Sequence, residues 1–242
     1  MGKKGGRNKL KSIAAPRSWD ISRKGDRFVY KPTPGPYPIA ASYPLGVVIR
    51  DLAAMATRSK EVKFILNSGR VLIDGTERHT PNFPVGLFSI VSVPVEGVNL
   101  RLVPSPKGLV LAKLGADETN KKLCRVSTKT KVGGGHIQYG LHDGRSILAD
   151  SLNLSPGDAV LLEVPSQKVL GQVKLAKGSV GLILSGVRAG QTGKIAEVKN
   201  GTISRERMVR ISLPGGDAEI PSRLVFPVGT DGPMITVGAA AR

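Results

Sequence analysis

Apolar residues follow two different spacings along this chain, and the spacing changes near residue 85. From Leu45, apolar residues recur at Val48, Ile49 and Leu52, three or four positions apart, directly after Pro44. This spacing places the apolar side chains on one face of a helix, and proline is favoured at a helix start. The pattern therefore predicts a short amphipathic helix over about 45–55.

A second helix is predicted over about 59–68. Ser59 is a suitable cap, Glu61 lies in the first turn, and Gly69 is suited to the end. Its two expected faces are an apolar one and a basic one: Val62, Ile65 and Leu66, against Lys60, Lys63 and Asn67.

A β-hairpin is predicted after this helix. The stretch 70–73 reads as a strand, and the Asp74-Gly75 dipeptide is a strong turn signal. Together the helices and the hairpin predict a small unit with a basic surface made of Arg58, Lys60, Lys63, Arg70 and Arg78. By itself such a surface is equally compatible with an ordinary solvated face.

Beyond residue 85 the apolar spacing becomes two, which indicates strands. The predicted strands are 85–93, 98–103, 108–114, 123–128, 136–141, 146–149 and 159–164, separated by Gly, Pro, Asp and Asn. This alternation is typical of antiparallel β-structure. The glycine triplet 133–135 follows Lys129 and Lys131 and predicts either a loop that faces RNA or a plain hairpin tip.

The stretch "GSVGLILSGVRAGQTGKIAEV", 178–198, predicts two strands joined by a glycine-rich loop. Glycines at that density indicate positive φ angles or close backbone approach. Further strands are predicted at about 207–213, 218–220, 223–228 and 234–237.

The first 41 residues fit neither pattern. They hold Trp19, the one tryptophan of the chain, and prolines at positions 32, 34, 36 and 38. Proline restricts the backbone and so lowers the entropy lost on ordering. We expect a basic arm that becomes ordered on a partner, with Trp19 anchoring it to the protein body or in an RNA crevice.

Charge narrows the choice of partner. The 242 residues include 36 Lys and Arg against 18 Asp and Glu, a net charge of +18, and ten of the basic residues lie in the first 31 positions. Such an excess favours a polyanionic partner, foremost nucleic acid. Apolar runs of about 18 residues, which a membrane span needs, are absent from the sequence. A single cysteine, Cys124, allows no internal disulfide and suits the cytoplasm.

Catalytic and metal-binding patterns are weak. Three histidines and one cysteine supply no spacing typical of a metal site, and the pair His142-Asp143 is more typical of a turn than of a catalytic base. We expect no enzyme activity, no metal and no cofactor.

Three stretches resemble known families. "RSKEVKFILNSGRVLIDG" (58–75) resembles the S-four-type RNA-binding domain, and 178–198 resembles the KOW motif of small SH3-like barrels. "AAPRSWDISRKGDRFVYKPTPGPYPIAASYPLGVVIRD" (14–51) is similar to the N-terminal signature of the small-subunit ribosomal protein S-four-e family of archaea and eukaryotes, although Asn8 or Lys9 stands where members often have histidine.

The resemblance implies an α+β, mostly β protein in four parts. These are a basic arm (1–41), a helix-turn-helix plus hairpin domain (42–95), a central antiparallel β domain (96–170), and a KOW SH3-like barrel with a C-terminal tail (171–242). It also implies a structural component of the small ribosomal subunit in the cytoplasm. Its partners would be rRNA and neighbouring ribosomal proteins, without a membrane or a small-molecule substrate.

RNA contact is expected mainly through phosphate and shape, because aromatic residues make up only 4% of the chain. The candidate RNA-binding residues are Lys3, Lys4, Arg7, Lys9, Lys11, Arg17, Trp19, Arg23, Lys24, Arg27, Lys31, Arg58, Lys60, Lys63, Arg70, Arg78, Lys129, Lys131, Arg188 and Lys194. Two alternatives stay open: a free translation or transcription factor that uses a KOW barrel for protein contacts, and, less favoured, an RNA-modifying enzyme without its catalytic signature.

Overall fold

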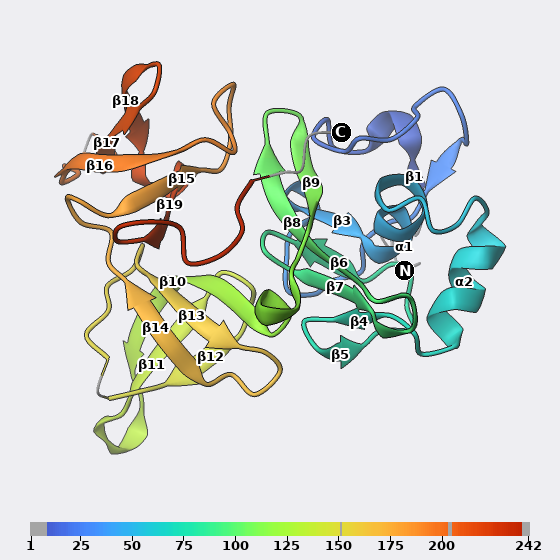
Figure 1. Ribbon diagram of the computed structural model, residues 1–242, viewed down its shortest axis with the longest axis horizontal. Helices are drawn as coiled ribbons and strands as arrows, with labels where there is room; N and C mark the ends of the chain where they lie inside the picture. The colour runs from blue at the N-terminus through green and yellow to red at the C-terminus, as the bar shows by residue number, and fades with distance from the viewer. Residues whose placement is uncertain (1–8, 151, 203–204, 239–242) are drawn as a thin grey trace, which may run out of the picture.

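Antiparallel strands dominate the computed structural model, which describes residues 9–150, 152–202 and 205–238. They form three five-stranded sheets and two short two-stranded pairs. Figure 1 shows the chain as three lobes: an N-terminal lobe (9–113) on the right, a central lobe (121–173) at the lower left, and a C-terminal lobe (180–229) above it. The chain is therefore mostly β with few helices, as predicted.

The N-terminal lobe is built on a sheet with strand order β5-β4-β7-β8-β9. Its strands are β4 (Leu72–Ile73), β5 (Thr76–Glu77), β7 (Ile90–Val93), β8 (Val98–Ser105) and β9 (Gly108–Lys113). Two short pairs adjoin it: β1 (Leu10–Lys11) with β2 (Phe28–Val29), and β3 (Ser42–Pro44) with β6 (Pro84–Gly86).

Helices are present at both predicted places. α1 (Leu45–Val47) continues as a π-helical turn, Val48–Leu52, and α2 spans Ser59–Asn67. Ser59 is not the cap of α2 but its first residue. The Glu61 carboxylate instead accepts hydrogen bonds from the backbone N–H groups of Thr57 and Arg58. This bonding satisfies donors that a helix start leaves without partners.

The Asp74-Gly75 turn joins β4 to β5 as predicted. Both residues have positive φ angles, 50° and 76°, which the tight turn requires and which glycine adopts without strain. The Asp74 side chain is buried, and its carboxylate accepts a hydrogen bond from the backbone N–H of Ile90. The turn is thus tied to the next strand of the sheet.

The described part of the predicted arm is folded onto the N-terminal lobe, in contrast to an arm ordered only on a partner. Trp19 is 3% exposed and belongs to the core beneath the helices. Tyr37 packs against Gly86, where a Cβ atom would lie 2.5 Å from its ring. The prolines hold this segment extended over the lobe, and its aromatic side chains supply the contacts that local periodicity does not reveal.

Two further sheets follow. The central sheet has the order β12-β11-β10-β13-β14, and the C-terminal sheet has the order β18-β17-β16-β15-β19. The central strands are β10 (Lys121–Lys131), β11 (Ile137–Leu141), β12 (Ser146–Leu148), β13 (Ala159–Glu163) and β14 (Val169–Val173). The C-terminal strands are β15 (Val180–Ile183), β16 (Thr192–Lys199), β17 (Met208–Leu213), β18 (Gly216–Pro221) and β19 (Val225–Gly229).

The structure departs from the predicted boundary between residues 95 and 96. β8 pairs with β7 through a tight turn, and β9 pairs with β8, so the first sheet continues to Lys113. The turn at 94–97 joins neighbouring strands of one sheet, and the period-two pattern does not mark where a new sheet begins. The change of sheet comes instead in the stretch 114–120.

The strands also differ from the prediction in other places. The predicted strand 85–93 is interrupted by Phe88, whose φ angle is +57° and whose ring packs edge-on against Phe226 at 5.0 Å. The strand β14 has no counterpart among the predicted strands. The stretch 234–237 is not a strand, although Ile235 and Val237 are buried.

A shared core holds the three lobes together. It contains Phe88 and Val103 of the N-terminal lobe, Leu123 of the central lobe, and Phe226 and Val228 of the C-terminal lobe. The chain after β19 runs back from the C-terminal lobe toward the N-terminal lobe (Figure 1). The lobes are thus packed against one another on apolar side chains.

Candidate nucleic-acid interface

The exposed face of α2 carries the first group of predicted RNA-binding residues. Val62 and Leu66 are fully buried against the lobe, and Ile65 is partly buried. Lys60 and Lys63 are exposed, with Arg58 at the helix start. The helix therefore presents a row of cations to solvent, as its sequence predicts.

The hairpin after α2 adds two exposed cations. Arg70 precedes β4 and Arg78 follows β5. The Arg78 guanidinium lies over the Phe83 ring, with its Cζ 4.5 Å from the ring centre. This contact restrains a long side chain that would otherwise lose more entropy on binding a partner.

The N-terminal segment is the described part of the predicted arm, residues 9–41. It presents five exposed cations: Lys9, Lys11, Arg17, Lys24 and Arg27. Lys31 is partly buried. Arg23 is turned inward, since its guanidinium donates to the backbone carbonyls of Ser12, Ala15 and Pro16. It therefore stabilises the segment itself.

Trp19 does not belong to an RNA-facing surface. Its ring stacks on Tyr43 at 5.6 Å between centres, and its Nε1–H donates to the carbonyl of Ser42 at 2.8 Å. The Tyr43 hydroxyl in turn donates to the carbonyl of Ser18 and accepts from the N–H of Asp20. Trp19 anchors the N-terminal segment to the protein body, which corrects its place among the candidate RNA-binding residues.

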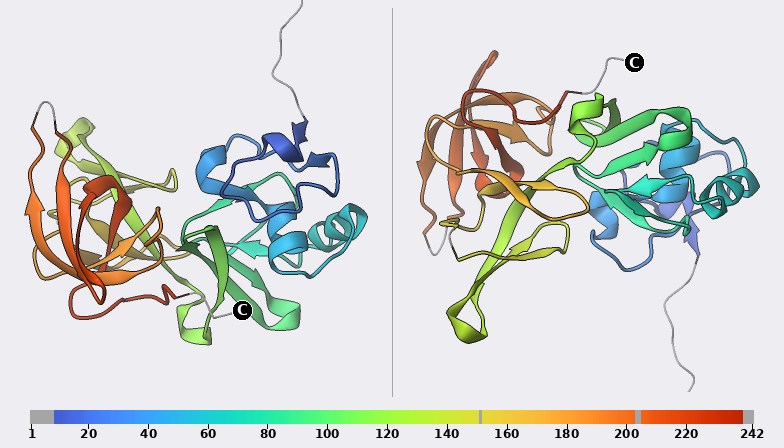
Figure 2. Two further views of the ribbon diagram at one scale, coloured as in Figure 1. Left: turned by 90° about the horizontal axis from the view of Figure 1, so that it is seen from above. Right: turned by 60° about the horizontal axis from the view of Figure 1, so that its bottom comes forward.

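The remaining predicted cations lie in two other places. Lys129 and Lys131 are exposed on β10, where the β10–β11 hairpin projects away from the body of the protein (Figure 2). Arg188 and Lys194 are exposed in the C-terminal lobe. Lys3, Lys4 and Arg7 lie outside the described residues. The structure thus spreads the candidates over all three lobes.

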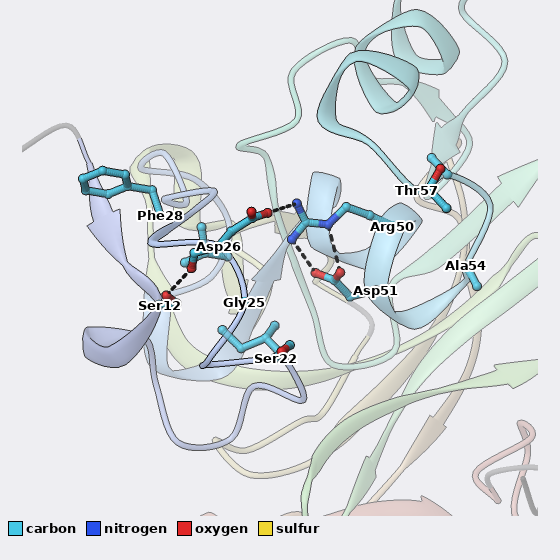
Figure 3. Close-up of a pocket in the computed structure, with 12 residues that line it drawn as sticks. Ser12, Ser22, Gly25, Asp26, Phe28, Arg50, Asp51, Ala54 and Thr57 are labelled. Carbon is cyan, nitrogen blue, oxygen red and sulfur yellow. Dashed lines mark hydrogen bonds and ion pairs between the residues drawn. The ribbon is translucent and has the colours of Figure 1, made fainter.

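A pocket of about 420 Å³ lies beside the N-terminal segment, between the β1–β2 pair and the π-helical turn. Figure 3 shows Arg50 between two carboxylates. Arg50 donates to both carboxylate oxygens of Asp51 at 2.9 and 3.0 Å, and lies 3.6 Å from Asp26. These contacts join the segment to the turn, and they raise the pKa of Arg50.

A buried charge network joins the N-terminal and central lobes. The Lys122 ammonium donates to Asp74 at 2.6 Å and to the Tyr37 hydroxyl at 3.0 Å, and it lies 3.1 Å from Asp143. Arg145 lies 3.2 Å from Asp74 and 3.5 Å from Asp143. Burial by itself would lower the pKa of Lys122, but the groups around it, Tyr37 and Asp74 first, raise it well above its usual range.

Sequence reasoning does not find this network. The sequence predicts a turn at Asp74 and a second turn at His142-Asp143, and it assigns no role to Lys122. The two acidic groups lie in different lobes and come together only in the folded chain. The network neutralises both carboxylates inside the protein, so they do not offset the exposed cations.

Cys124, His142 and Asp143 lie close enough together to suggest a metal site, with ligand atoms within 4.8 Å of one another. The Lys122 ammonium, 3.1 Å from the Asp143 carboxylate, already supplies the positive charge there. Burial raises the pKa of the Cys124 thiol, which disfavours the thiolate that a metal needs. The donor set is therefore poorly suited to a metal ion.

His142 makes stability depend on pH. Its Nδ1 accepts a hydrogen bond from the backbone N–H of Arg125. Burial, and next the Lys122 ammonium, lower the pKa of His142 to about 4, against about 6.5 in an unfolded chain. Between these pH values the unfolded state binds the extra proton, so stability falls as the pH falls. We expect a loss of about 3 kcal/mol from pH ~6.5 to pH ~4.

Denaturant unfolding at a series of pH values measures this effect. The control is His142→Asn, whose side-chain oxygen can accept the same hydrogen bond but does not titrate. The pKa of Asp143 is lowered, so this group loses its contribution at still lower pH. Parallel curves for the two proteins would contradict the assignment.

No helix in the described part of the chain is long and apolar enough to cross a membrane.

Comparisons with known proteins gave matches over nearly the whole chain. The sequence model of "Ribosomal family S4e" matches residues 96–169, and that of the "RS4NT (NUC023) domain" matches residues 4–39.

Two relatives and one solved structure illustrate the similarity. "Small ribosomal subunit protein eS4" of Korarchaeum cryptofilum is 39% identical over 208 residues, 86% of this chain and 88% of the relative. The protein of the same name from Methanosphaera stadtmanae is 36% identical over 98% of both chains. The crystal structure of the 30S ribosomal protein S4e from Thermoplasma acidophilum is 27% identical, with a TM-score of 0.67 over 78% of this chain and 95% of that one.

Proposed function

The chain belongs to the S4e family of ribosomal proteins, and we propose on that premise that the exposed candidate cations named above hold small-subunit rRNA. It is a structural component of the small ribosomal subunit, with rRNA and other ribosomal proteins as partners, and its place in the cell is the cytoplasmic ribosome. We expect a non-catalytic role, in which the protein binds and stabilises folded RNA.

The observation that carries the RNA-binding surface is the exposure of its cations. Fourteen of the candidate cations are exposed to solvent. The carboxylates of Asp74 and Asp143, in contrast, pair with Lys122 inside the protein. Contacts between Lys or Arg and phosphates need neither a deep pocket nor a base sequence. A surface spread over three lobes suits recognition of RNA shape and backbone.

The two finer assignments of the fold remain proposals. We infer that α1, α2 and the β4–β5 hairpin act as an S-four-type RNA-binding unit, supported by the cationic face of α2 and the Asp74-Gly75 turn. We infer that the C-terminal lobe is a KOW-type barrel. The glycine-rich loop between β15 and β16, with positive φ angles at Gly186 and Gly190, supports it.

Removing two cations from α2 tests the surface. The double variant Lys60→Ala, Lys63→Ala is expected to weaken binding to purified small-subunit rRNA. It is also expected to reduce the slope of log affinity against log salt by about 2, because each lysine that neutralises a phosphate adds about 1 to that slope. Titrations of labelled rRNA at several salt concentrations measure this slope.

The matched control is Lys168→Ala, which removes an exposed lysine outside the proposed surface. An unchanged slope in the double variant would remove α2 from the interface. Sedimentation tests the proposal as a whole: the protein is expected to remain in the small subunit at moderate salt. A position at the top of the gradient would favour a free factor instead.

A further inference from the structure

Phe28 is the exposed aromatic side chain of a segment in which Trp19 and Tyr37 are buried and Tyr30 is partly buried. Its exposed fraction is 43%, against 3% for Trp19 and 7% for Tyr37. Figure 3 shows the ring extending from β2 away from Arg50 and Asp51. Burial in the core therefore does not account for a phenylalanine at this position.

Two cations lie over the Phe28 ring, and a third is placed beside it by the pairing of the strands. The Lys9 ammonium and the Arg27 guanidinium carbon each lie 5.5 Å from the ring centre. Lys11 is the cross-strand partner of Phe28 in the β1–β2 pair, and residues directly opposite in such a pair project from the same face. The carboxylate of Asp26, two residues before Phe28, points to Arg50 and not to these cations (Figure 3).

An unpaired nucleotide offers the chemistry that matches this arrangement. A nucleobase is a flat aromatic group that stacks on a phenylalanine ring, and its flanking phosphates attract Lys and Arg. Lysine and arginine side chains are long enough to move from the ring toward those phosphates. Phe28 also helps to line the pocket of about 420 Å³, so there is open space beside this residue.

We propose that Phe28 is a stacking platform for one unpaired nucleobase of the RNA, with Lys9, Lys11 and Arg27 binding the phosphates beside it. This inference rests on the proposed rRNA-binding function and adds to it one position where the RNA must be single-stranded. Contacts elsewhere on the surface involve phosphate and shape, whereas this one requires a base that has left its helix.

Two substitutions of Phe28 distinguish stacking on its ring from general apolar contact. Phe28→Leu keeps an apolar side chain of similar size but removes the aromatic ring, whereas Phe28→Tyr keeps the ring. Ile13→Ala is the matched control, because Ile13 is 81% exposed in the same segment. Since Phe28 is exposed, all three variants are expected to unfold at the denaturant concentration of the wild type.

The experiment measures the affinity of each full-length variant for purified small-subunit rRNA at several salt concentrations. Because a base cannot stack on leucine, Phe28→Leu is expected to bind rRNA about 5- to 100-fold more weakly. The slope of log affinity against log salt is expected to stay unchanged, since no charge is removed. Phe28→Tyr and Ile13→Ala are expected to bind within about twofold of the wild type.

An rRNA affinity of Phe28→Leu equal to that of the wild type would overturn the platform and leave the rRNA-binding function intact. Equal weakening by Phe28→Leu and Phe28→Tyr would also overturn it, because stacking survives in the second variant. Normal rRNA affinity combined with poor assembly of Phe28→Leu into subunits would assign the ring to a protein neighbour. Failure of the wild type to bind rRNA would instead overturn the proposed function and this inference together.

Discussion

Lys122→Met is expected to lower the free energy of unfolding by about 3–5 kcal/mol, although methionine fits a similar volume. The Lys122 side chain is 1% exposed and lies between Asp74 and Asp143, whose side chains are 8% and 2% exposed. Removing the ammonium leaves two buried carboxylates facing each other with Arg145 as their remaining cation. The cost of an uncompensated buried charge, rather than poorer packing, produces the effect.

Denaturant unfolding compares this variant with Lys129→Met, which removes an exposed lysine from the same strand and is expected to change stability by less than about 0.5 kcal/mol. A second variant isolates the cause. Adding Asp74→Asn and Asp143→Asn to Lys122→Met removes the two buried negative charges that lack the ammonium. This triple variant is expected to be more stable than Lys122→Met alone. Equal stability of Lys122→Met and the wild type would show that the network contributes little.

The network joins the N-terminal and central lobes, so its loss is also expected to affect rRNA binding. Asp74 lies in the hairpin that follows α2, and Lys122 lies on β10, which also carries Lys129 and Lys131. We therefore expect Lys122→Met to weaken rRNA binding beyond the loss of one charge, since the cations of the two lobes would no longer be held in one arrangement.

Trp19→Ala is expected to cost about 3–5 kcal/mol and to release the N-terminal segment from the lobe. The substitution removes the ring that stacks on Tyr43, leaves a cavity in the core, and deprives the buried carbonyl of Ser42 of its donor. Denaturant unfolding measures the change in stability. Limited proteolysis is expected to cleave residues 14–41 of the variant faster than those of the wild type.

Trp19→Phe keeps an aromatic ring and loses the hydrogen bond, so a smaller cost of about 1–2 kcal/mol is expected. Ile13→Ala, an exposed change in the same segment, is expected to be within about 0.5 kcal/mol of the wild type. Because Trp19 is the single tryptophan of the chain, selectively excited tryptophan emission of the wild type reports on this segment alone. A solvent-exposed emission spectrum would contradict its burial.

Local features of the fold could be predicted because their signals are local. The spacing of Val62 and Leu66 predicts which face of α2 is buried, and the same spacing leaves Lys60 and Lys63 outside. The Asp74-Gly75 dipeptide predicts its turn through the φ angles that the two residues tolerate. The alternating stretches predict most strands, but they do not show that β8 and β9 remain in the first sheet.

The exposure of the candidate residues was predictable in part for the same reason. Exposure of a lysine follows from the cost of removing its charge from water, so most of the candidate cations among the described residues lie outside. Lys31 is partly buried. Arg23 and Trp19 are turned inward, because backbone carbonyls and the Tyr43 ring provide partners that the sequence does not place beside them.

Sequence patterns were sufficient for the class of this protein: a mostly β chain whose charge favours a polyanionic partner and whose motifs resemble one ribosomal family. Helical and strand periodicities, turn dipeptides and net charge depend on neighbouring residues or on simple totals, so they can be read without coordinates. The folded structure was needed to show that Trp19 is an anchor, that Lys122 is buried, and that Phe28 remains outside. Each of these depends on which distant surfaces meet, since burial of a charge or a ring is stable only where the fold brings partners from other segments to it.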